Sequence, residues 1–185
     1  MNNVNNGFLP LGYKEVSNYM KFVDGENRFR ILSSAIVGWE YWNEDKDGNR
    51  KPIRKRFDED LLIGEIQEPD KVKKFWAFVV WNYKDEAVQI LELTQKGIKK
   101  DIQALINNKK WGSPINSYDL VVNKSGTGLA TKYTTQPDPK EPTDKKITEA
   151  YKIKPIYLEA LFKGEDPFIV ISKGNEDVDP DSIHL

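Results

Sequence analysis

The stretch of sequence that decides the fold covers residues 73–93 and reads KKFWAFVVWNYKDEAVQILEL. Its two apolar, β-prone runs, Lys73–Tyr83 and Ala87–Leu93, flank a polar KDE triplet, which is the pattern of a β-hairpin. The first run is apolar on both faces. It is therefore either a central strand covered on both sides or a strand that exposes stacking residues on one face. We expect most of it to be core, with Trp76 or Tyr83 exposed.

Alternation of apolar and polar residues and turn signals predict further strands on both sides of this hairpin. Upstream, Asn27–Ser33 alternates apolar with basic residues, and Ala35–Trp42 and Arg50–Phe57 flank a turn that contains Asp47-Gly48. Downstream, a Lys-Ser-Gly-Thr-Gly turn joins the predicted strands Tyr118–Asn123 and Leu129–Thr135.

A helix is predicted at residues 95–108, because Ile98, Ile102, Leu105 and Ile106 recur at helical spacing. This helix lies between the strand that ends at Leu93 and the next strand pair. An OB-fold is a five-stranded Greek-key barrel with a helix between its third and fourth strands. The order of elements therefore predicts a mainly β protein: an OB-fold five-stranded barrel with one inserted helix and flexible termini.

The two ends of the chain differ from this β-rich middle. We expect a flexible arm at residues 1–18, the OB-fold domain at residues 19–150, and a short helix with an acidic tail at residues 151–185. A helix around Ile147–Phe162 would be interrupted near Pro155. Seven acidic and two basic residues follow position 158, against 22 acidic and 26 basic residues before it. A mildly basic body thus carries an acidic end.

Composition excludes several classes of site. The 185 residues contain no cysteine and a single histidine, His184. Disulfides, thiolate zinc sites and cysteine nucleophiles are therefore excluded, and histidine-based metal or Ser-His chemistry loses its usual component. No apolar run approaches the roughly 18 residues of a membrane span, and the amino terminus lacks the pattern of a secretion signal. We expect a cytoplasmic protein that needs no cofactor or metal and contacts no membrane.

Binding of single nucleic-acid strands needs cations that follow the phosphates and flat faces on which unpaired bases stack. Residues 50–57 carry five basic side chains and end on Phe57, and the strand just upstream carries three aromatic ones. The alternative is a solvated charged strand beside core tryptophans. The predicted site comprises Trp39, Tyr41 and Trp42 for stacking and Arg50, Lys51, Arg54, Lys55 and Arg56 for phosphates.

Further candidates extend this site. Arg28 and Arg30 alternate with apolar residues on the first strand and would lengthen the basic track. Trp76 and Tyr83 offer additional aromatic faces, and the late hairpin offers Lys124, Lys132 and Tyr133 as a second contact, because OB barrels use inter-strand loops as groove walls. Four lysines on or near the helix are more simply explained as a solvent face. These are Lys99, Lys100, Lys109 and Lys110.

Taken in order, several segments resemble phage single-stranded DNA-binding proteins. They are Lys21–Leu32, Gly38–Trp42, Phe75–Tyr83, Gln89–Gln95, Trp111-Gly112, Tyr118–Leu120 and Gly126–Gly128. The resemblance covers roughly residues 19–150 and rests on a pattern without an invariant signature. It implies an OB-fold, sequence-independent binding of single-stranded DNA and a role in phage DNA replication or recombination, in the host cytoplasm.

The resemblance also bears on metals and partners. Related proteins often carry a cysteine-based zinc module, which this cysteine-free chain cannot form, so zinc is not carried over. They commonly end in an acidic tail that contacts replication proteins and competes with DNA. The tail here is similar in character, with Glu176, Asp177, Asp179 and Asp181. A tail that only increases solubility would have the same composition.

Two other functions stay open. An aromatic-lined β-domain that binds protein or sugar would account for the tryptophans but not for the basic residues, and its binding would be insensitive to salt. A metal-dependent nuclease could use Asp70 with Glu86 or Glu92, but the expected Glu-x-Lys partner is missing. The sequence therefore favours a binding protein over an enzyme.

Overall fold

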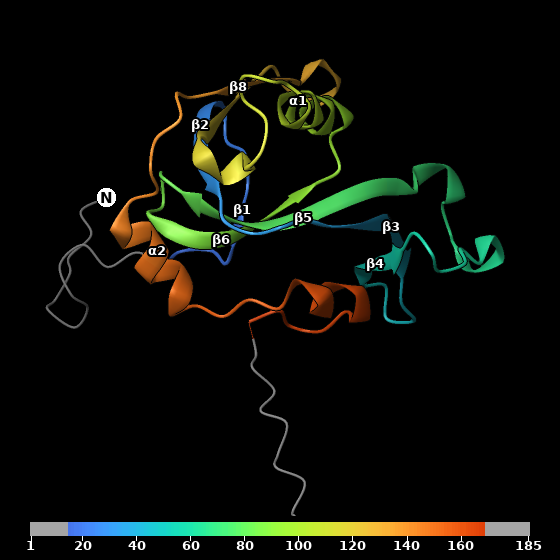
Figure 1. Cartoon of the computed structure of the whole chain (residues 1–185). Coiled ribbons are helices and arrows are strands. Elements are labelled where there is room, and N and C mark those ends of the chain that lie inside the picture. The colour runs from blue at the N-terminus through green and yellow to red at the C-terminus, as the bar shows by residue number, and fades with distance from the viewer. Residues whose placement is uncertain (1–14, 169–185) are drawn as a thin grey trace, which may run out of the picture.

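Strand β5 (Lys73–Asn82) lies at the centre of an eight-stranded sheet in the computed structural model, which describes residues 15–168 (Figure 1). One edge of β5 pairs with β6 (Ala87–Leu93), as the predicted hairpin requires. Two strands share the other edge. The first half of β5 pairs with β3 (Ile36–Glu44), and its end pairs with β2 (Gly25–Ile31).

Five of the strands follow the order of an OB barrel. After β6, the chain forms helix α1 (Lys96–Ile106) and then the hairpin of β7 (Asp119–Ser125) and β8 (Lys132–Pro137). Strand β7 returns to pair with β2 in antiparallel register, so the first and fourth strands of the barrel are neighbours. The predicted mainly β, OB-type fold with one helix between the third and fourth barrel strands is confirmed.

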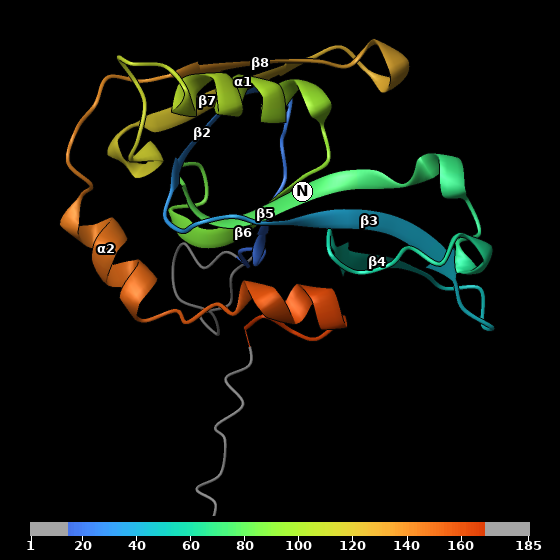
Figure 2. The ribbon, with the colours of Figure 1, turned by 45° about the vertical axis from the view of Figure 1, so that its right-hand side comes forward.

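The sheet contains three strands besides the five of an OB barrel, and two of them, β3 and β4 (Arg50–Arg56), match the strands predicted at residues 35–42 and 50–57. Strand β1 (Tyr19–Met20) adds two parallel pairs to β6. Strand β3 and its partner β4 form a hairpin inserted between the first two barrel strands. Figure 2 shows β3 and β4 extending the sheet to the right of the barrel. Because β3 also pairs with β5, this hairpin is a continuous extension of the central sheet.

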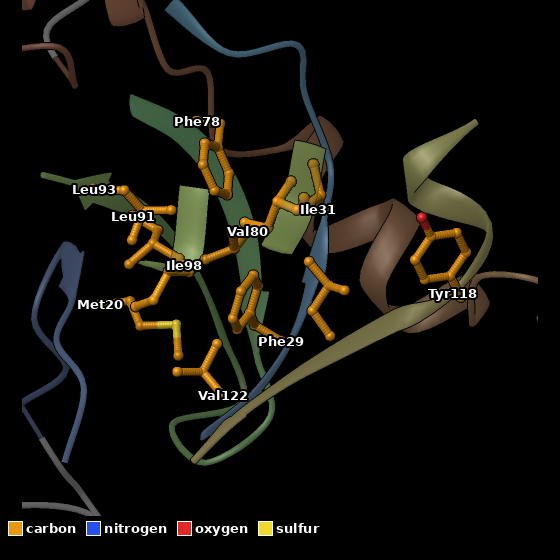
Figure 3. Close-up of a cluster of buried hydrophobic side chains, with 12 residues drawn as sticks. Met20, Phe29, Ile31, Phe78, Val80, Leu91, Leu93, Ile98, Tyr118 and Val122 are labelled. Atoms are coloured by element: carbon orange, nitrogen blue, oxygen red, sulfur yellow. The ribbon is translucent and has the colours of Figure 1, made fainter. Parts of the chain in front are cut away.

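Both faces of β5 are buried, in two separate cores. One face carries Phe78 and Val80, which pack inside the barrel against β2, β6, β7 and α1 (Figure 3). The other face carries Phe75, Val79 and Trp81. It is covered by helix α2 (Lys145–Lys152) and the short 3-10 helix η5 (Leu158–Lys163), which lie on that side in Figure 2. The sequence left two explanations of the apolar run. The first holds for most of it, because β5 is a central strand covered on both sides, while Trp76 near its start is only half-buried.

The C-terminal elements belong to the same folded unit as the sheet. The helix expected at residues 147–162 is interrupted near Pro155, giving α2 and η5. The expected domain boundary at residue 150 falls inside α2. At the other end, Ser17 and Asn18 accept hydrogen bonds from Gln89 and Ile90, so the end of the expected arm is held against β6. Four more 3-10 turns complete the described chain: Ile63–Glu65, Pro69–Lys71, Ile115–Ser117 and Gly128–Ala130.

A glycine is required where η5 meets the inserted hairpin. A Cβ atom on Gly38 would overlap the carbonyl oxygen of Lys55 on β4 and lie 2.9 Å from Cε1 of Phe162 on η5. Phe162 in turn packs edge-on against Phe75, with ring centroids 5.7 Å apart. The small residue therefore lets η5 close against the hairpin as well as against β5.

Candidate nucleic-acid interface

The basic stripe predicted on β4 is present, but each of its five cations is paired with a carboxylate. Register places β4 beside β3, as expected for neighbours in one hairpin. The partners come from four separate parts of the chain. The pairs are Arg50–Glu68, Lys51–Asp45, Arg54–Glu40 and Glu92, Lys55–Glu59, and Arg56–Glu159. The stripe therefore presents much less net positive charge than its sequence indicates.

Arg54 is a structural residue. Its side chain is 9% exposed and donates hydrogen bonds to Glu40 at 3.0 Å and Glu92 at 2.9 Å. Its guanidinium also lies 5.4 Å from the ring centroid of Phe75. Burial raises the pKa of Glu92, with Arg54 acting in the opposite direction. Because the guanidinium already binds two carboxylates, Arg54 is not available for the phosphate contact predicted for it.

Arg28 and Arg30 also differ from the prediction. Both donate to the fully buried carboxylate of Asp119, and Arg30 donates to the carbonyl of Glu141 at 3.0 Å. Arg30 is 1% exposed and has no face left for a phosphate. Arg28 is partly exposed and stacks on Tyr83, 4.5 Å from the ring centroid. Burial, followed by hydrogen bonding to Asp119, raises the pKa of Tyr83 to about 12. These residues form an internal network that ties β2 to β7.

The three aromatic residues of β3 separate onto two faces, as alternation along a strand requires. Tyr41 is buried, so it cannot stack on a base, and this part of the prediction is wrong. Trp39 is half-buried and packs edge-on against Phe57, with ring centroids 5.1 Å apart. Trp42 is 44% exposed on the opposite face. Phe57 is itself 46% exposed.

A groove beside Trp39 gathers cations and aromatic rings. It has a volume of 810 Å³ and lies between Trp39 of β3 and the start of β5 on one side and helix α1 on the other. Trp76 contributes a second half-buried indole. We call this the lysine groove, since five lysines and one aspartate line it. Its lining is Trp39, Asp70, Val72, Lys73, Lys74, Trp76, Thr94, Lys96, Lys99, Lys100 and Gln103.

The lysines of the groove differ from those of the basic stripe because none of them forms a salt bridge with any residue from 15 to 168. Lys74 places its ammonium 5.4 Å from the Trp39 ring centroid, a cation–π contact. Lys99 is 8% exposed and donates to the backbone carbonyl of Lys74. Burial, then the charges of Lys74 and Lys96, lower the pKa of Lys99. An anion in the groove would relieve this repulsion.

Sequence reasoning missed these lysines as a group. The spacing of Lys96, Lys99 and Lys100 on α1 is i, i+3, i+4, which places them on one side of the helix and was available as a signal. What no local pattern shows is that this side of α1 faces the start of β5. Lys73 and Lys74 begin the apolar run 73–83, which was interpreted as a strand of the core, so their charges were not considered as part of a site.

The remaining candidates lie outside the groove lining. Lys124 forms a salt bridge with Asp24 at 2.8 Å, and hydrogen bonding to this carboxylate raises its pKa. Tyr133 packs on Phe22 and the barrel core. Lys132 is exposed near the β7–β8 turn. The structure thus joins Trp39, Trp76 and Phe57 to the lysines of the groove and leaves this hairpin separate.

The carboxylates of the nuclease alternative do not come together. Asp70 lines the lysine groove, Glu86 pairs with Lys146 at 2.7 Å, and Glu92 pairs with Arg54. Over residues 15–168, no three His, Asp or Glu side chains form a group that could hold a metal ion. Within the same residues, no helix has the length and apolar character needed to cross a bilayer.

Comparison with curated proteins finds a distant relative. Over 147 residues the chain is 24% identical to the protein of Escherichia phage T5 named probable ssDNA-binding protein. The match covers 68% of this chain and 56% of the phage T5 protein, so the chain spans little more than half the length of this curated relative. No protein-family model matches the sequence, and no solved structure matches it.

Proposed function

We propose that this protein binds single-stranded DNA in the lysine groove, without sequence preference and without chemical action on the DNA. One observation carries this proposal: a single groove is lined by Trp39, Trp76 and five lysines. None of these lysines has a salt-bridge partner among the described residues. Lysines neutralise phosphates, and indole faces stack on unpaired bases of any sequence. The name of the phage T5 relative supports the same substrate.

The groove suits a single strand better than a duplex. In a duplex the bases are stacked on each other, and their faces are not available to a protein. In the groove, Trp39 lies within cation–π distance of Lys74, so a base stacked there would have its phosphate close to an ammonium group. The salt-bridged arginines of β4 contribute less, because a phosphate must compete there with a carboxylate.

The proposed biological role is support of phage DNA replication or recombination, in the cytoplasm of a host cell. It rests on the resemblance to phage single-stranded DNA-binding proteins and on the name of the phage T5 protein. Contact with replication proteins would be made by the acidic tail, whose residues 176–181 lie outside the described part of the chain.

The proposal is tested by replacing Trp39 with alanine and measuring the anisotropy of a labelled oligo-dT. Stacking on one aromatic side chain is worth about 1–3 kcal/mol per base, so Trp39→Ala should weaken binding by roughly 5- to 150-fold. Trp111→Phe is the matched control, since Trp111 packs on Tyr118 and is not part of the groove lining. Equal affinities of the two variants would overturn the assignment of the groove.

A further inference from the structure

A second cavity adjoins the lysine groove on the other face of the inserted hairpin. It has a volume of 310 Å³, and we call it the Trp42 pocket. Lys73 and Thr94 belong to its lining and to that of the lysine groove, so the two concavities adjoin at these residues. The lining of the Trp42 pocket is Glu40, Trp42, Arg50, Glu68, Lys71, Lys73 and Thr94.

The route between the two cavities passes around the end of the sheet. Trp39 and Trp42 point to opposite faces of β3, and Lys73 and Lys74 to opposite faces of β5. Lys73 is the first residue of β5, and Thr94 directly follows the end of β6. A flexible chain that leaves the groove at these two residues therefore reaches Trp42 without crossing the sheet.

The two cations Arg50 and Lys71 of the Trp42 pocket are both paired with the carboxylate of Glu68. Glu68 accepts a hydrogen bond from Arg50 at 2.6 Å and another from Lys71. The bond from Lys71, and then that from Arg50, lower the pKa of Glu68, so its carboxylate is ionised at neutral pH. Arg50 and Lys71 are nevertheless 52% and 63% exposed, so a phosphate can reach both.

We infer that the Trp42 pocket is a second nucleotide subsite, entered by a single strand that leaves the lysine groove past Lys73 and Thr94. Trp42 stacks on a base, and Arg50 and Lys71 bind its phosphate. In the free protein the Glu68 carboxylate occupies the place of that phosphate and weakens the subsite. This inference rests on the proposed function and adds to it a path for the strand and a residue that opposes binding.

The subsite predicts a dependence on strand length that the groove alone does not. Single-strand sites on OB domains cover about 4–16 nucleotides. An oligo-dT of about 4 nucleotides fills the lysine groove only, whereas one of about 16 also reaches the Trp42 pocket. Removing the opposing charge should therefore strengthen binding of the long strand and leave the short one unchanged. A gain in affinity cannot be produced by a misfolded variant.

The experiment measures the affinity of both oligonucleotides for wild type, Glu68→Gln, Trp42→Ala and Glu65→Gln. Glu65 lies in the same β4–β5 connection but outside the pocket lining, so it controls for the change in net charge. We expect Glu68→Gln to bind the long strand at least about fivefold more tightly, and Trp42→Ala at least about fivefold more weakly, the size of one stacking contact. The short strand should distinguish none of the variants.

Four results would overturn the inference. Two concern Glu68→Gln: the same effect on both strands, or an effect no different from that of Glu65→Gln. Two concern Trp42→Ala: unchanged affinity for the long strand, or equal weakening of binding to both strands. In each case the lysine groove stands if wild type binds the short strand. If wild type binds neither strand, the proposed function fails and the subsite fails with it.

Discussion

The ammonium group of Lys99 on α1 donates a hydrogen bond to the backbone carbonyl of Lys74 on β5. This contact joins the inserted helix to the central strand at the lysine groove, beside the Lys74 side chain that faces Trp39. Because Lys99 is buried and lies close to other cations, the contact holds a positive charge where water screens it weakly.

The buried position of Lys99 should make DNA binding sensitive to alkaline pH. Burial and neighbouring cations lower its pKa in the free protein, and a bound phosphate favours the charged form. Affinity should therefore fall as pH rises through the lowered pKa, before ordinary lysines titrate near 10.5. Lys99→Arg stays protonated and should flatten this decline in titrations with oligo-dT from neutral pH to about pH 10. Identical pH profiles of the two proteins would contradict the role of Lys99.

Neutralising the exposed lysines of α1 should reduce the salt dependence of binding. Each phosphate contact to a single strand contributes about 0.7 to the slope of log K against log salt. Lys96→Gln with Lys100→Gln should therefore lower the slope by about 1.4. Lys145→Gln with Lys152→Gln makes the same charge change on α2, which covers the opposite face of the sheet, and should leave the slope unchanged. Equal slopes in both double variants would remove α1 from the site.

Replacing Arg54 should destabilise the fold. Arg54→Met leaves Glu40 and Glu92 without their shared cation in a buried place, and breaking a buried pair costs about 3–5 kcal/mol. Arg50→Met on the same strand breaks only the exposed pair with Glu68 and should cost less than about 1 kcal/mol. Urea unfolding measures both losses. Similar losses in the two variants would show that Arg54 is not the structural residue described above.

Removing the charge of Glu92 should stabilise the protein at neutral pH. Burial raises the pKa of this carboxyl in the folded state above its ordinary value of 4.5. Between these two values the folded state binds more protons than the unfolded state, so stability falls as pH rises. Glu92→Gln avoids this loss of stability, and Arg54 retains its salt bridge with Glu40 in the variant. The variant should match wild type below pH 4.5 and exceed it at neutral pH in thermal unfolding, and a less stable variant at neutral pH would refute the prediction.

Local patterns were sufficient to predict the barrel elements. The β5–β6 hairpin, α1 and the β7–β8 hairpin follow from alternation, helical spacing and turn residues that lie close together in sequence. Local patterns could not predict that both faces of β5 are covered. The second cover comes from α2 and η5, which lie more than 60 residues further along the chain.

The candidate site depended even more on distant contacts. The stripe on β4 looked like a phosphate track, but Glu92 and Glu159, which pair with Arg54 and Arg56, are remote in sequence. Conversely, Lys99 and Lys100 were interpreted as part of an ordinary solvent face, whereas the fold places them in the groove that Trp39 lines. The opposite orientations of Trp39 and Trp42 follow from the alternation of side chains along a strand, so this relationship needs no information beyond the sequence.

The central claim is that bases stack on tryptophans while lysines bind phosphates, and tryptophan fluorescence of the wild-type protein tests it most directly. Titration with oligo-dT at low and moderate salt, beside a duplex of equal length, should show strong quenching by the single strand. The quenching should weaken as salt rises and be absent with the duplex. Fluorescence that does not change with either nucleic acid, or that changes equally with both, would contradict the account.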